Sequence, residues 1–133
     1  MVRMPGASGG RRERGAAAVE FALVAPLLLI LLLGIIEFGF VFNNQISLNQ
    51  AVREGVRVEA LETGSGDEVT RASFLGVTGS GGDLGVSVSG CDGDAERATV
   101  TATYPHQLVV LPGGLLSIGN PTLTGEATMR CGG

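Results

Sequence analysis

The sequence of 133 residues contains no tryptophan and no lysine, and it has one histidine and two cysteines. A lone histidine and scattered carboxylates offer no catalytic constellation, and His106 beside Pro105 is typical of a loop residue rather than a base. The basic residues are all arginine, and none cluster with aromatics beyond the first 15 residues, so nucleic-acid binding has little support. We therefore predict no enzyme, no cofactor and no nucleic-acid partner.

Charged and aromatic residues are also scarce. Charged residues make up 17% of the sequence and aromatics 5%, against roughly 25% charged residues in an average soluble domain. The length allows one small domain. Because 44% of the residues are nevertheless hydrophobic, the aliphatic side chains must be concentrated in one region, which argues against an evenly mixed globular enzyme.

The charges that are present are divided unequally. Residues 1–15 hold four arginines and one glutamate, for a net charge of +3, whereas the rest holds five arginines and twelve acids, for a net charge of −7. A basic leader at 1–15 therefore precedes an acidic body.

One apolar run, Phe21–Phe42, accounts for the hydrophobicity. Only Pro26, Gly34, Glu37 and Gly39 interrupt it. As a helix this run would be roughly 33 Å long, against a hydrocarbon core of about 30 Å. We predict a single transmembrane helix over 16–42 in the cell membrane. The arginines before it indicate a cytoplasmic N-terminus and an extracytoplasmic domain over 43–133.

Two other interpretations of the run carry less weight. A buried core helix would need more cover than the following residues, with few aromatics, can supply to a helix that is apolar on every side. A cleaved secretory signal has a shorter apolar region and a small-x-small site after it, and no such site closely follows the run here.

Glu20 stands at the edge of this span. A carboxylate carried to the bilayer centre costs on the order of 2 to 3 kcal/mol, so such residues are usually functional or paired. Position alone leaves two interpretations, a solvated interfacial residue that pairs with Arg14 or a lipid amine, and a functional residue.

The surrounding pattern resembles the processing site of type IV prepilins of the Flp/Tad class. In that pattern a basic leader ends in glycine, here Gly15, and four residues separate it from a Glu-Phe pair, here Glu20 and Phe21. The resemblance continues through Pro26, the segment 34–39 and the segment 51–57. The series as a whole resembles the TadE-like family of pseudopilins, over about residues 14–60.

The resemblance implies a function in the assembly of tight-adherence pili. A prepilin peptidase would cut between Gly15 and Ala16, and Glu20 would neutralise the new α-amino group in its own chain or across a subunit boundary. Partners would be this peptidase, other pilin or pseudopilin subunits and the Tad assembly platform, with the protein in the membrane or in the pilus. The competing hypothesis is an unprocessed, membrane-anchored binding or regulatory module.

The helix is expected to continue beyond the membrane. Leu48, Val52, Val56 and Ala60 recur at spacings of four and predict one narrow apolar stripe. The opposite side carries polar and charged residues that are either a solvated face or, in the family pattern, a helix contact: Arg53, Glu54 and Arg57. Glu37, close to the outer interface of the membrane, either reaches outward to water or makes a subunit contact.

The remaining residues predict loops and short strands. The long helix should stop near 64–66, and 68–75 could add one or two helical turns. Alternating β-branched residues predict strands at 85–89, 98–104 and 122–129, with the apolar patch 108–116 covering the sheet. The expected fold is therefore α+β and pilin-like, a long N-terminal transmembrane helix that extends into a small exterior domain with a short antiparallel sheet.

The two cysteines, Cys91 and Cys131, most simply form one disulfide in an extracytoplasmic domain. Closing a loop of about 41 residues would stabilise the domain by roughly 4 kcal/mol in the chain-entropy description. Two free thiols are a poorer interpretation, and so is a zinc site, because zinc needs ligands that a lone His106 cannot complete.

Overall fold

The computed structural model describes residues 10–78, 83–92, 95–108 and 119–132. The elements follow in the order α1 (Gly10–Ala60), α2 (Gly66–Thr78), β1 (Gly85–Ser89), β2 (Arg97–Pro105) and β3 (Thr122–Arg130). The predicted fold class is confirmed, since a long apolar N-terminal helix leads into a small domain with a three-stranded antiparallel sheet. We call the residues from 43 onward the head.

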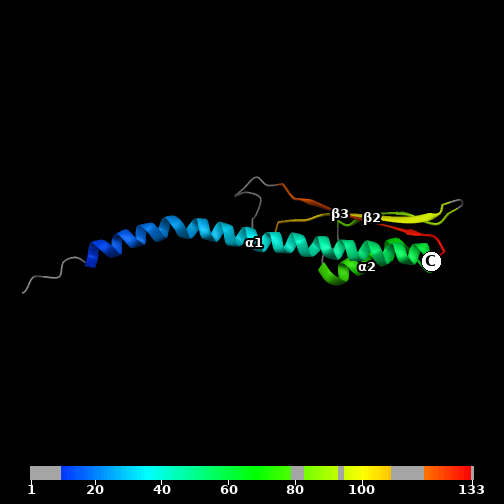
Figure 1. The fold of residues 1–133 in the computed structure, drawn as a ribbon, viewed down its shortest axis with the longest axis horizontal. Helices are drawn as coiled ribbons and strands as arrows, with labels where there is room; N and C mark the ends of the chain where they lie inside the picture. The colour runs from blue at the N-terminus through cyan, green and yellow to red at the C-terminus, as the bar shows by residue number, and fades with distance from the viewer. Residues whose placement is uncertain (1–9, 79–82, 93–94, 109–118, 133) are drawn as a thin grey trace, which may run out of the picture.

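Helix α1 is the axis of the molecule. It has 51 residues and rises about 75 Å at 1.5 Å per residue. Figure 1 shows its N-terminal half projecting away from all other elements, with the sheet and α2 packed along its C-terminal half. α1 continues through Pro26, which lacks an N–H and crowds the preceding turn, so this proline does not end the helix.

A Schellman motif ends α1 earlier than the sequence predicts. The Glu62 N–H donates to Glu59 O at 3.1 Å, and the Thr63 N–H donates to Val58 O at 3.1 Å. Glu62 takes the left-handed conformation, with φ at 52°, where glycine is usually found. The helix therefore ends at Ala60 rather than near 64–66.

Helix α2 begins almost at once and is longer than the one or two turns expected, with 13 residues. Its first N–H, on Gly66, donates to Glu59 Oε2 at 2.9 Å, so a carboxylate from α1 satisfies one of the free amides at the start of α2. The acidic residues Asp67 and Glu68 in its first turn also suit the positive end of the helix dipole. These contacts fix the start of α2 against the end of α1.

The three strands form an antiparallel sheet in the order β1-β2-β3. Val88 of β1 is opposite Val100 of β2, which is opposite Ala127 of β3. The predicted strands are confirmed to within one residue at each end. Alternate residues of β2 and β3 are buried on the face toward α1: Ala98, Val100, Ala102 and Leu123.

The core lies between this face, α1 and α2. The predicted stripe is confirmed, because Leu48, Val52, Val56 and Ala60 are all buried. From α2, Phe74 is fully buried and meets Tyr104 of β2 edge to face, with ring centroids 4.9 Å apart. The described residues of the head thus form a single core around one helix face.

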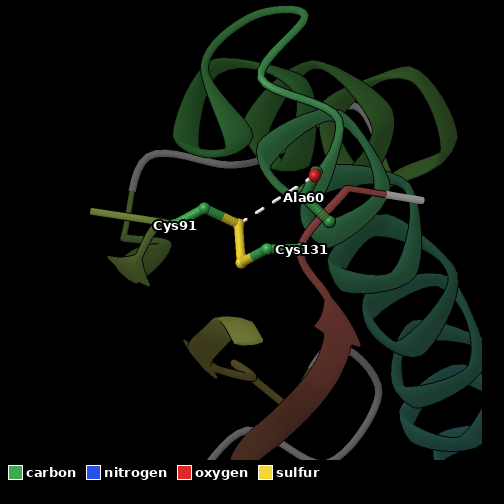
Figure 2. The surroundings of a disulfide bond; sticks show 3 residues. All are labelled: Ala60, Cys91 and Cys131. Atoms are coloured by element: carbon green, nitrogen blue, oxygen red, sulfur yellow. Dashed lines mark hydrogen bonds between the residues drawn. A yellow bond between two sulfur atoms is a disulfide. The ribbon is translucent and has the colours of Figure 1, made fainter. Parts of the chain in front are cut away.

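The predicted disulfide between Cys91 and Cys131 is present, with Cα atoms 5.8 Å apart. Figure 2 shows it beside the C-terminal end of α1, where Cys91 Sγ lies 3.9 Å from Ala60 O. The Gly132 N–H donates to the same carbonyl oxygen at 3.1 Å. The bridge therefore joins the ends of β1 and β3 at the point where α1 stops.

Two predictions lie mostly outside the described residues. They concern the leader 1–15 and the apolar patch 108–116.

Candidate functional site

The predicted processing and assembly residues lie together on the free half of α1. Gly15, Ala16, Glu20 and Phe21 are all helical and exposed. Phe21 is 72% exposed, and no other element of the described chain covers this segment (Figure 1). The structure thus leaves these four residues accessible to a partner.

The large apolar residues in this half of α1 are exposed on every side of the helix. Large side chains of this kind are Val19, Leu23, Val24, Leu27, Leu28, Leu29, Ile30, Leu31, Leu32, Ile35 and Ile36. The most apolar window of the helix is not buried at all, and in the described part of the chain this is the one helix long and apolar enough to cross a membrane. It is therefore not a core helix of this chain, and it fits a single-pass membrane protein.

The geometry around Gly15 is open. A Cβ built on this glycine would meet nothing within 4 Å. Glu20 follows Ala16 by four residues, a rise of about 6 Å along the helix. One helical turn therefore separates the expected new N-terminus from the carboxylate expected to neutralise it.

Glu37 is buried, and the interpretation that it reaches outward to water is wrong. Only 4% of the residue is exposed, and its Oε1 lies 3.4 Å from His106 Nε2. The reason is tertiary, because the segment that follows β2 brings His106 against α1. This contact lies within the chain.

His106 is held from three sides. Its backbone N–H donates to Pro121 O at 2.9 Å, and its Nδ1 lies 2.9 Å from Asn44 Nδ2. On the third side its Nε2 lies 3.4 Å from Glu37 Oε1. His106 thus lies in a loop, as expected, but is buried there, with 3% exposed.

Sequence reasoning missed this junction of Glu37, Asn44 and His106. One signal could have indicated it, because a carboxylate inside an apolar run requires a polar partner. Asn44 follows Glu37 by seven residues, two helical turns, and so faces the same side. No sequence pattern near Glu37 indicates that its partner is His106.

The charged residues of the predicted helix contact lie on the uncovered face of α1 in the head. Arg53, Glu54 and Arg57 are exposed. Within the described residues they form no ion pair with one another, whereas Arg71 of α2 pairs with Asp67 at 2.9 Å. Arg53 lies about 50 Å along the helix from Glu20, so the structure does not bring these two parts of the prediction together.

Comparison with known families gives a match that lies within α1. Residues 15–57 match the family model described as TadE-like protein. This segment is TadE-like. The match to the TadE-like family begins at the predicted processing glycine, runs through Glu20 and Glu37, and ends at Arg57, before α2 and the sheet. No curated protein and no solved structure matches the chain.

The TadE-like match thus lies within α1, and it agrees with the resemblance noted in the sequence over residues 14–60. Within the described residues no group of three or more His, Cys, Asp or Glu side chains could hold a metal ion. What the geometry offers is an accessible apolar helix with one carboxylate near its start and a second, buried one where the head begins.

Proposed function

We propose that this chain is a minor pilin or pseudopilin that takes part in assembling Flp/Tad pili. Its α1 helix spans the membrane with the N-terminus cytoplasmic and the head extracytoplasmic. A prepilin peptidase removes the leader after Gly15, and the mature helix then packs with other pilin subunits or with the Tad assembly platform. The role is structural rather than enzymatic.

The observation that carries the proposal is the uncovered half of α1 together with its TadE-like match. The head buries its own core without that half, so an apolar helix of membrane-spanning length remains for lipid and for other helices. The basic leader supports the proposed orientation.

Processing at Gly15 requires the helix to unwind locally so that the peptide bond lies extended in the peptidase. Gly15 favours this step, because glycine in a helix is roughly 0.5–1 kcal/mol less stable than alanine. It also presents no side chain to the enzyme. The open surroundings of Gly15 leave room for the peptidase to approach.

Cleavage would leave an α-amino cation on Ala16 within a turn of Glu20. A charge left unpaired in lipid is costly, so arrangements of the helices in which this cation pairs with a Glu20 carboxylate are favoured. If the carboxylate belongs to the neighbouring subunit, the pair sets how far one helix is shifted along the next.

The test is the mass of the mature protein. The full chain, co-expressed with a prepilin peptidase from a Tad system, should lose residues 1–15, while Gly15→Leu should keep them. Gly34→Leu is the matched control, because Gly34 lies in the same helix and is also open around its Cα. This variant should be cleaved like the unaltered chain.

If the leader is retained, the chain would instead be a membrane-anchored binding or regulatory module. Gly15 lies inside a continuous helix that begins at Gly10, and this observation favours an unprocessed signal anchor that carries the head as a binding or regulatory module. Retention of the leader by the unaltered chain in the presence of an active peptidase would support that module and reject the pseudopilin.

A further inference from the structure

The junction of Glu37, Asn44 and His106 bears on where the bilayer ends on the head side. Composition alone places that boundary after Phe42. Glu37 would then lie about 7.5 Å inside the hydrocarbon, because it precedes Phe42 by five positions along the helix. His106 meets Glu37 at this depth, so part of the head would have to lie in the hydrocarbon as well.

The polar groups of the head at this level argue against that depth. Gln107, next to His106, is exposed, and an unpaired amide in hydrocarbon costs several kcal/mol. The backbone that follows β2 is not helical, and irregular backbone exposed to lipid does not occur in the hydrocarbon region. The hydrocarbon must therefore end at or before the level of His106.

We propose that the hydrocarbon ends at Glu37 and that the end of the head around His106 lies in the lipid headgroup layer. From Ala16 to Glu37 the helix rises about 32 Å, close to the hydrocarbon thickness of about 30 Å. Glu37 thus lies at the boundary, where the head supplies its polar partner.

Residues 37–42 then cross the headgroup layer. They rise about 7.5 Å, and one headgroup layer is about 5 to 7.5 Å thick. The rings of Phe38 and Phe42 stack with centroids 6.2 Å apart and are 69% and 57% exposed. Phe side chains occur on the apolar faces of helices that bind at the membrane interface, so this pair, like Gln107, would lie at the level of the lipid headgroups.

This inference rests on the membrane insertion in the proposed function, but not on cleavage or on pili. The test measures depth in the unprocessed full chain in phosphatidylcholine vesicles. Both native cysteines are in the disulfide, so a fluorescent label reacts only with an added cysteine. Four variants are labelled: Leu32→Cys, Phe42→Cys, Gln107→Cys and Glu126→Cys. Nitroxide lipids that carry the quencher in the headgroup or near the end of the acyl chain are then compared.

The label at Leu32 should be quenched more by the acyl-chain nitroxide, and those at Phe42 and Gln107 more by the headgroup nitroxide. Glu126, an exposed residue of β3, is the control and should respond weakly to both. Stronger acyl-chain quenching at Phe42 would overturn the proposed boundary. A label at Leu32 that neither lipid quenches would overturn insertion itself, whereas an uncleaved leader with the expected ratios would leave the boundary in place.

Discussion

At the scale of single residues, glycines determine how closely the other elements approach α1. A Cβ at Gly55 would overlap the hydroxyl of Thr70 and lie 2.8 Å from Gly66 O. Thr70 is fully buried and donates to Gly66 O at 2.7 Å, so it has no room to move. On the sheet side, a Cβ at Gly125 would lie 3.2 Å from Leu48 Cγ. The packing of the head therefore depends on glycines, which have no side chain, as well as on apolar side chains.

We expect Gly55→Val to push α2 away from α1 and to lower the free energy of unfolding by about 1–3 kcal/mol, as overpacking does. A loss of 1 kcal/mol lowers the Tm by about 4–8 °C in a domain of this size. Thermal unfolding of the full chain in detergent micelles, followed by circular dichroism, measures it. Gly39→Val is the matched control, because a Cβ at Gly39 meets nothing within 4 Å. Equal melting temperatures for the two variants would contradict the close approach.

At the scale of elements, those built on local patterns could be predicted from the sequence. The spacing of Leu48, Val52 and Val56 identifies the buried face of α1, because residues four apart share a helix face wherever the helix lies. The strands could be predicted for the same reason, since alternation along β2 is set by the pleat.

Features that depend on distant contacts could not be predicted. The burial of Glu37 requires His106, 69 residues away in the sequence. The end of α1 at Ala60 depends on Glu62 taking a left-handed conformation. In the sequence, Gly64 and Gly66 are the residues expected to end the helix, because glycine adopts that conformation readily. The sequence therefore identified the exposed candidate residues of α1 but not the buried junction.

The disulfide also acts at the scale of elements, because it ties the ends of β1 and β3 to the end of α1 (Figure 2). Its reduction should lower the free energy of unfolding by roughly 4 kcal/mol, as expected for a loop of this length. Denaturant unfolding of the oxidised and reduced full chain in micelles measures the difference. The double variant Cys91→Ser with Cys131→Ser should match the reduced chain, and unchanged midpoints on reduction would show that the bridge contributes nothing.

At the scale of the whole molecule, one continuous helix carries both the candidate membrane span and the head. The proposed assembly role predicts that Glu20→Ala leaves insertion and leader cleavage intact but weakens association between copies, because the Ala16 amine loses its partner. Co-purification of two differently tagged copies from membranes, expressed with the peptidase, measures this. Val19→Ala, at the exposed neighbouring position, should associate normally, and Glu20→Asp should retain part of the association. Full association of Glu20→Ala would reject the pairing.

The unbroken course of α1 has a rotational consequence. Each residue turns a helix by about 100°, and α1 continues without interruption from Glu20 to the core residue Val56. The angular position of Glu20 about the helix axis is therefore fixed relative to that of the head. Copies joined through Glu20 would all present their sheets at one fixed angle, and a single residue inserted between Ile30 and Ile36 would swing every head about a quarter turn out of alignment.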